Sequence, residues 1–226
     1  MTTATYSPTT TARRDASRPR EFSDFAWTAE NGAQVAVILA RYPDTRPHSA
    51  IMPLLWLAQE QMAEATGSAW LPVPVIEYVA GVVAMPYMRA YEVATFYTMY
   101  NLKPIGKYLV QVCGTTPCLL RGSDDLLRAC KDKGLTKGGT TADGLFTLSE
   151  VECLGVCANA PMVQINADNY EDLDYNSMTT ILGALARGET PKPGSAIGRQ
   201  ASCPEGGPTT LLEVAGAGHS DHKELA

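Results

Sequence analysis

The chain has 226 residues, 45% of them apolar, and a formal net charge of −6 at pH 7. This size and composition suffice for one or two ordinary hydrophobic cores, which excludes disorder of the bulk of the chain. The negative charge gives no basic face that could follow a phosphate backbone, which argues against nucleic acid as a partner.

The first 20 residues contain four arginines and many threonines but no apolar stretch. Such a segment is not a secretory signal peptide, although an organellar transit peptide has a similar composition. It has no periodic apolar pattern, so we expect residues 1–20 to form a flexible arm. The longest apolar runs, such as residues 79–85, fall far short of the roughly 20 residues that cross a bilayer, and we expect no direct membrane insertion.

Apolar residues recur at helical spacing between residues 21 and 103, in segments separated by prolines. The repeats are Val35, Ile38 and Leu39, then Ile51, Leu54, Leu55 and Ala58, then Ile76, Val79, Ala80 and Val83. Residues 91–100 are expected to form a fourth helix, and the aromatic residues Phe96, Tyr97 and Tyr100 are expected to lie in the core. The pattern therefore predicts a small helical bundle over residues 21–103.

Residues 104–190 have a mixed pattern. A β-branched and aromatic run at residues 107–112 predicts a strand that leads into Cys113. Ser123, followed by acidic residues, predicts the N-cap of a helix that ends near Gly134. The remaining predicted elements are strands at residues 146–151 and 162–165, a hairpin turn at 166–169 and an amphipathic helix at 177–187. The resulting β-α-β-β-α order predicts a separate domain with a sheet.

Residues 191–226 are rich in proline and glycine and contain no periodic segment. They cannot form a core of their own, so we expect an extended C-terminal tail that is loose in the isolated chain. Leu211, Leu212 and Val214 give this tail one short apolar segment.

Four of the six cysteines form two close pairs that are far apart in the sequence. Cys113 and Cys118 enclose Gly-Thr-Thr-Pro, and Cys153 and Cys157 enclose Leu-Gly-Val. In a chain without an export signal, thiols and metal ligands are more common than disulfides. Each pair follows a predicted strand, in a loop whose glycine, Gly114 or Gly155, would let backbone amides approach a buried anion.

A [2Fe-2S] cluster needs two thiolate ligands on each iron, so two cysteine pairs on neighbouring loops would satisfy it with one pair per iron. Structural zinc sites also use four cysteines, usually with C-x2-C to C-x4-C spacing, and the spacings here do not exclude zinc. Disulfide or thiol chemistry is a third alternative. The residues alone favour the iron–sulfur cluster and leave all three open.

Several stretches in order along the chain resemble one known family. GKYLVQVCGTTPCLLRGS from Gly106, then TADGLFTLSEVECLGVCANAPMVQIN and NYEDL, resemble the thioredoxin-like [2Fe-2S] ferredoxins of NADH:quinone oxidoreductase. Upstream, SAIMPLLWLAQEQ, WLP, IEYVAGVV and YEVATFYTMYNLKPIGKY resemble the helical N-terminal region of the 24 kDa subunit type of respiratory complex I. Together these stretches cover about residues 22–188.

The resemblance implies an α+β fold, with the helical bundle followed by a thioredoxin-like α/β [2Fe-2S] ferredoxin domain over residues 104–190. It also implies that one [2Fe-2S] cluster is the cofactor. Its ligands would be Cys113 and Cys118 on one iron, and Cys153 and Cys157 on the other. No residue of the chain is expected to be catalytic by itself.

The implied function is one-electron transfer in the NADH dehydrogenase module of proton-pumping NADH:quinone oxidoreductase. The partner flavoprotein subunit would hold FMN and NADH, since this sequence has no GxGxxG motif opening a helix and no P-loop. The large iron–sulfur subunit of complex I would be a second partner. The expected location is cytoplasmic and peripheral to the inner membrane, with the matrix side of the mitochondrial inner membrane as the alternative.

Two alternatives to this function stay open. A similar diaphorase subunit serves NAD-linked hydrogenases and formate dehydrogenases, and a zinc-stabilised scaffold would have no redox role. In the tail, PKPG and SCPEGGPTTL resemble the extension of some complex I members, which favours complex I as the host. We therefore expect the tail to become ordered along neighbouring subunits, and its removal after Thr190 to leave the cluster intact.

Other candidate ligands have weaker support. Cys130 lies on an apolar helix face, where a cysteine is usually a small buried hydrophobe. Cys203 matches no ligand position of the family motif. His48, His219 and His222 have no companion ligands, so a histidine-ligated cluster has no support.

Overall fold

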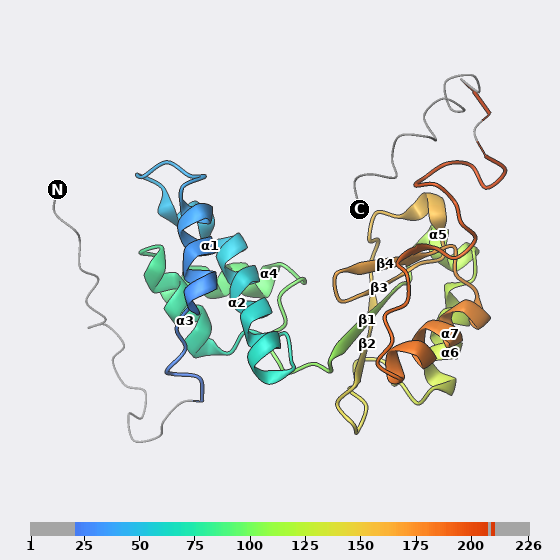
Figure 1. Cartoon of the computed structure of the whole chain (residues 1–226), viewed down its shortest axis with the longest axis horizontal. Coiled ribbons are helices and arrows are strands. Elements are labelled where there is room, and N and C mark those ends of the chain that lie inside the picture. The colour runs from blue at the N-terminus through green and yellow to red at the C-terminus, as the bar shows by residue number, and fades with distance from the viewer. Residues whose placement is uncertain (1–20, 208, 211–226) are drawn as a thin grey trace. The chain divides into compact units, whose positions relative to one another are not determined.

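The computed structural model describes residues 21–207 and 209–210, and the chain divides into two compact units, Met1–Lys107 and Tyr108–Ala226 (Figure 1). The flexible arm expected at residues 1–20 lies outside the described residues, as do Leu211, Leu212 and Val214. Within the described ranges, no helix combines the length and apolar character that a membrane span requires.

The first unit is a bundle of helices, as its apolar periodicity predicts. Its elements are α1 (Ala29–Leu39), the short 3-10 helix η1 (Pro47–Ala50), α2 (Ile51–Thr66), α3 (Val73–Val82) and α4 (Tyr87–Phe96). The apolar faces of α2 and α3 meet in its core, where Leu54, Leu55 and Ile76 are completely buried. Gln61 pairs polar groups inside this unit, since its side-chain oxygen accepts hydrogen bonds from the Thr28 backbone amide and from the side-chain amide of Asn31. The buried Trp27 indole N–H, in contrast, has no partner among the described residues.

Helix α4 begins and ends four residues earlier than expected. Pro86 precedes its first residue, where the fixed φ of proline suits the entry to a helix, and Tyr97 is extended, with φ −90° and ψ 113°. Tyr100 is buried and donates a hydrogen bond from its hydroxyl to the Met52 carbonyl oxygen (2.9 Å). Phe96, in contrast, is 78% exposed. The expectation of a core position is therefore correct for Tyr100 and wrong for Phe96 and for Tyr97, which is 40% exposed.

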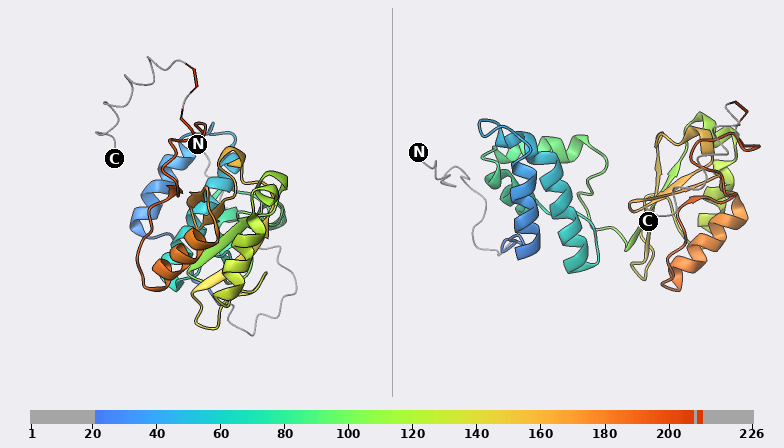
Figure 2. Two further views of the ribbon diagram at one scale, coloured as in Figure 1. Left: turned by 90° about the vertical axis from the view of Figure 1, so that its right-hand side faces the viewer. Right: turned by 45° about the horizontal axis from the view of Figure 1, so that its top comes forward.

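The second unit contains one mixed sheet with strand order β2-β1-β3-β4-β5 (Figure 2). Its elements are β1 (Tyr108–Cys113), α5 (Thr116–Leu120), α6 (Ser123–Asp132), β2 (Phe146–Val151), η2 (Cys157–Asn159), β3 (Val163–Ile165), β4 (Asp168–Glu171), α7 (Tyr175–Ala186) and β5 (Gly194–Ser195). β1 runs parallel to β2 and antiparallel to β3, β3 and β4 form a hairpin, and β5 is parallel to β4. The α+β fold class is confirmed.

Helices α6 and α7 lie side by side on one face of this sheet (Figures 1 and 2). Alternate residues of β1, Val110 and Val112, are fully buried against Leu126 of α6 and Met178 of α7 within one apolar cluster. Cys130 belongs to the same cluster and is completely buried, which confirms its expected role as a small hydrophobe.

Two helix starts differ from the sequence-based expectation. Helix α6 begins at Ser123, with Gly122 as the N-cap residue, and the buried Ser123 hydroxyl finds no partner among the described residues. Helix α7 begins at Tyr175, two residues early, because Asp174 and Ser177 form a reciprocal capping box. The five-residue helix α5 was not expected, since a segment this short shows no apolar period.

The expectation of a loose tail is wrong for the residues directly after α7. The chain turns at Gly188 (φ 78°) and comes back along β4, where Gly194 and Ser195 pair with Tyr170 and Glu171 as strand β5. The Ala196 amide extends the pairing with a hydrogen bond to the Glu171 carbonyl oxygen (2.9 Å). Backbone pairing fixes this segment, which explains why its proline-rich, aperiodic sequence did not reveal it.

Candidate metal centre

The parallel pairing of β1 and β2 brings the two cysteine loops to the same edge of the sheet. Cys113 is the last residue of β1 and lies opposite Val151, the last residue of β2. Cys153 follows Val151 by two residues. Because parallel strands end at the same edge, the segments that carry both cysteine pairs leave the sheet side by side.

The first pair is part of the protein interior. Cys113 and Cys118 are 2% and 1% exposed, and they form a small apolar cluster with Ala160 and Met162, against which Leu154 and Val156 pack. Cys118 lies on helix α5 and not in a loop, so its backbone is fixed by helical hydrogen bonds. Water has little access to either sulfur.

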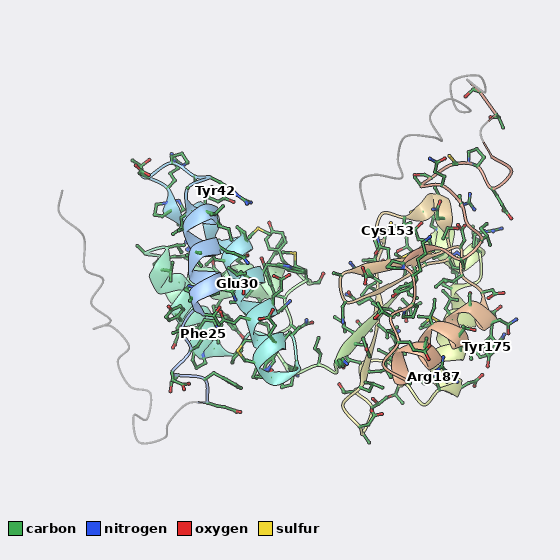
Figure 3. The ribbon with its side chains drawn as sticks, viewed as in Figure 1. Phe25, Glu30, Tyr42, Cys153, Tyr175 and Arg187 are labelled. Carbon is green, nitrogen blue, oxygen red and sulfur yellow. The ribbon has the colours of Figure 1, made fainter. Side chains whose placement is uncertain are left out.

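The second pair is exposed and follows β2, with Cys153 in the loop after that strand and Cys157 as the first residue of η2. Cys153, labelled in Figure 3, and Cys157 are both exposed, and their sulfur atoms are 3.3 Å apart. The Gly155 amide between them donates a hydrogen bond to the Cys153 sulfur (3.4 Å). Gly155 has φ 85°, in the left-handed region that only glycine adopts without strain.

The thiols influence one another across the two pairs. Burial raises the pKa of Cys118 to about 11, and the hydrogen bond with Cys113 and the charges of Cys113 and Cys157 add to this rise. The pKa of Cys157 is raised first by its hydrogen bond with Cys153, and the charge of Cys113 also contributes. The charge of Cys113 thus acts on Cys157, so the buried pair and the exposed pair are coupled electrostatically.

Cys113 is the thiol most easily ionised among the coupled groups. Burial on its own would raise its pKa, but hydrogen bonds from the Thr115 backbone, from Cys118 and from the Leu154 backbone outweigh it, and the pKa is lowered. Such hydrogen bonds favour a thiolate, which is the form that binds a metal.

The two loop glycines have different roles. The Gly155 amide reaches a sulfur, as expected, but the Gly114 amide donates to the Val151 carbonyl oxygen (3.0 Å) and so continues the pairing of β1 with β2. A Cβ atom on Gly114 would come within 2.7 Å of a carboxylate oxygen of Glu150. A side chain at position 114 would therefore meet the movable side chain of Glu150, and the Gly114 amide serves the strand pairing and not a sulfur.

The chemistry of the donor set fits a group bound by thiolates. It offers four cysteines and no histidine, and soft sulfur ligands select iron–sulfur clusters or zinc. No group of three or more cysteine, histidine or carboxylate side chains within the described ranges is already closed into a metal-binding geometry. The sulfurs are arranged as two pairs with charge coupling between them.

The remaining candidate ligands lie elsewhere. Cys130 is in the core between α6 and the sheet, and Cys203 is half-buried in the segment after β5. His48 belongs to the first unit, in η1, and His219 and His222 lie outside the described residues.

Sequence reasoning missed a set of buried polar contacts that begins two residues after the exposed pair. Asn159, two residues after Cys157, is buried and donates hydrogen bonds from its side-chain amide to Glu171 and to the Ala201 carbonyl oxygen. Asp172 and Arg199 form a buried ion pair in the same region. No local pattern connects positions that are 27 or 42 residues apart.

Comparison with known proteins gives a family and close relatives. The model of the thioredoxin-like [2Fe-2S] ferredoxin family matches residues 35–186. The E subunit of the NADH-quinone oxidoreductase of Rickettsia conorii is 54% identical over 166 residues, which are 73% of this chain and 96% of the relative. Its counterpart in Rickettsia bellii is 53% identical over 166 residues, with the same shares covered.

The likeness to solved structures is weaker. An air-oxidized NAD+-reducing [NiFe]-hydrogenase aligns with a TM-score of 0.49 and 19% identity, over 59% of this chain and 23% of the hydrogenase chain. Similarity at this level supports no conclusion about function.

Proposed function

Because the chain belongs to the thioredoxin-like [2Fe-2S] ferredoxin family, and within it to the E subunits of NADH-quinone oxidoreductase, we propose that it is a one-electron carrier with one [2Fe-2S] cluster. The proposed ligands are Cys113 and Cys118 for one iron, and Cys153 and Cys157 for the other. The observation that carries the proposal is the delivery of both cysteine pairs to one edge of the sheet by the parallel strands β1 and β2.

The chain's own groups suit a negatively charged sulfur-bound centre. A [2Fe-2S] cluster bound there would supply a carrier that takes up and returns one electron. Ala160 and Met162 exclude water from Cys113 and Cys118, and the Gly155 amide donates to the Cys153 sulfur. The exposed pair is the side of the site that is open to a redox partner.

We further propose the host and the electron donor. The chain would accept one electron from reduced FMN in a flavoprotein subunit that also binds NADH, and would return it within the complex. The relatives from the NADH-quinone oxidoreductases of Rickettsia support complex I as the host, with the large iron–sulfur subunit as the other neighbour. The proposed location is the cytoplasmic face of the inner membrane, or the matrix face in a mitochondrion.

Metal analysis of the full chain, purified without oxygen, tests the cluster. We expect about two irons and two sulfides per chain, a coloured protein and an EPR signal on reduction. A colourless protein with zinc and no sulfide would overturn the proposal. Cys130→Ala and Cys203→Ala serve as controls and should keep the colour.

A redox titration followed by EPR tests the proposed role. All-thiolate [2Fe-2S] centres of plant-type ferredoxins have potentials near about −400 mV, and the negative chain disfavours adding an electron. We therefore expect a low midpoint and only partial reduction by NADH in the complex. A midpoint above about −150 mV would contradict a role next to the NADH-linked flavin.

A further inference from the structure

The segment after α7 forms a strap along the second unit. We use this name for residues 191–203, drawn in orange and red after α7 in Figure 1. Strand β5 fixes its first half against β4, and the Tyr170 hydroxyl donates a hydrogen bond to the Pro191 carbonyl oxygen (3.3 Å). The strap is therefore tied to the sheet before it reaches Arg199.

A buried ion pair fixes the second half of the strap. Arg199 holds Asp172 through two parallel hydrogen bonds of 2.6 and 2.9 Å, and the two side chains are only 8% and 3% exposed. The Ser195 hydroxyl donates to the same carboxylate (2.6 Å), and Arg199 also donates to the Cys203 carbonyl oxygen (3.0 Å). Removing one member of such a pair leaves the other charge, which has little access to water, without its charged partner.

Backbone conformation shows that these contacts hold the chain in place. Asp172 has φ 52° and Ala201 has φ 46°, both in the left-handed region that side chains other than glycine rarely adopt. Residues keep such conformations where surrounding contacts determine them. Asp172 is held by Arg199 and Ser195, and Ala201 is held by Asn159.

Asn159 connects the strap to the loop of the exposed cysteines. Its side-chain amide donates to the Ala201 carbonyl oxygen of the strap (2.8 Å) and to Glu171 at the end of β4 (2.6 Å). The Asp172 amide in turn donates to the Asn159 carbonyl oxygen (2.8 Å). Asn159 shares the short helix η2 with Cys157, so a shift of Asn159 moves the Cys157 backbone.

We propose that Asn159, Asp172 and Arg199 form a latch that positions Cys157 for metal binding. The three are positioning residues, because they act through the backbone of η2 and their side-chain hydrogen bonds within the described residues go to oxygen atoms. This inference rests on the proposed function, in which Cys157 is an iron ligand. It also replaces the expectation that the cluster is independent of everything after Thr190.

The latch predicts faster loss of iron when it is opened. Arg199→Met keeps an apolar stem but removes the guanidinium, so Asp172 loses its charged partner, and Asn159→Ala removes the side-chain bond to the strap. In the full-length protein with its cluster, each variant should transfer iron to an added chelator on the order of tenfold faster than the parent, as is usual when the support of a metal ligand is lost. Arg199→Lys keeps the positive charge but not the two parallel hydrogen bonds of the guanidinium, and its rate of iron release should be intermediate.

The same chain offers a matched control. Arg187 also makes two parallel hydrogen bonds to a carboxylate, that of Glu189, but this pair is exposed and Arg187 lies at the opposite end of the unit from Cys153 (Figure 3). Arg187→Met should release iron at the parent's rate. Equal acceleration by Arg187→Met and Arg199→Met would overturn the latch.

Two further readouts separate positioning from general destabilisation. Cys130→Ala lowers the stability of the same unit without touching the latch. When Arg199→Met and Cys130→Ala are compared under conditions that give them the same urea midpoint, Arg199→Met should still lose iron faster. Arg199→Met should also change the EPR line shape, which Cys130→Ala should not. If iron loss simply follows the urea midpoint and the line shape is unchanged, the proposal is wrong.

Amide exchange in the metal-free chain keeps this test distinct from that of the proposed function. Arg199→Met should increase hydrogen exchange at the Asp172 amide, which is bonded to Asn159 in the parent. Unchanged exchange there would refute the latch whether or not the chain binds iron. A parent chain that binds no iron, in contrast, would refute the proposed function. The exchange result would still show whether Arg199 holds the strap against the loop.

Discussion

The two cysteine pairs are built in opposite ways. Cys113 and Cys118 lie on a strand and a helix and are buried in an apolar cluster. Cys153, in a loop, and Cys157, at the start of η2, are both exposed. The sheet and helix fix the first pair directly. The second pair depends on a left-handed glycine within its own loop and on hydrogen bonds made just after it. The site that we propose would therefore combine ligands that the core positions with ligands that an exposed segment positions.

The largest expected effect, loss of the cluster, is the same for both cysteine pairs. Replacing any one of the four cysteines by alanine should bleach the protein, because an iron that lacks one thiolate is open to hydrolysis and oxidation. Iron content and the visible spectrum of Cys113→Ala and Cys153→Ala measure this. If Cys153→Ala kept two irons and the parent's spectrum, the exposed pair would not belong to the site.

A second prediction compares the two cysteine segments by replacing the glycine in each with alanine. Gly155→Ala forces a side chain into the left-handed region and should cost roughly 1–2 kcal/mol of folding free energy, with weaker retention of iron. Gly114→Ala displaces only the flexible end of Glu150, which pairs with Lys137 in a largely exposed contact, and should cost less than about 0.5 kcal/mol. Urea unfolding of both metal-free variants checks the order, and the reverse order would show that the exposed loop is not held by Gly155.

A third prediction concerns the metal-free chain, in which the pairs should differ. Cys118→Ala removes a buried thiol and leaves a small cavity, which should lower the free energy of unfolding by about 1 kcal/mol. Cys157→Ala removes an exposed thiol and should change it by less than about 0.5 kcal/mol. Equal losses in urea unfolding would mean that the burial difference has no energetic weight.

The smallest effect at neutral pH involves a buried cysteine outside the site. Burial raises the pKa of Cys130 to about 12 from an ordinary 9.0. Above pH 9 the unfolded chain releases this proton and the folded chain keeps it, so stability is full below pH 9 and then falls by about 1.4 kcal/mol per pH unit until the folded pKa is reached. Comparing urea unfolding of the parent and Cys130→Ala between pH 8 and 10.5 isolates this contribution. The difference between them should shrink as the pH rises, and a constant difference would contradict it.

The sequence predicted the elements whose signals are local. Strand β2 has the predicted bounds, Phe146–Val151, because β-branched and apolar residues alternate there between clear breaks. The four helices of the first unit were predicted from their apolar periodicity. The family was predicted from the sequence motifs around the cysteines. Errors at the ends of α4 and α7 have local causes that act against periodicity, a proline entry and a capping box.

The long-range contacts beside the proposed site could not be predicted from local sequence patterns. A bond between Asn159 and Ala201, or between Asp172 and Arg199, joins positions whose neighbours carry no periodic signal. Strand β5 consists of two residues, one of them a glycine, and only the edge of β4 makes it a strand. The burial difference between the cysteine pairs also depends on the packing of Met162 and Ala160, which follows from the assembled sheet.

The position of Arg199 in the chain has a consequence for synthesis. A ribosome releases Asp172 first and Arg199 27 residues later, so every cysteine pair and the whole sheet up to β4 emerge while the carboxylate still lacks its partner. The contact that ties the strap to the segment around Cys157 can therefore form only after both cysteine pairs have left the ribosome.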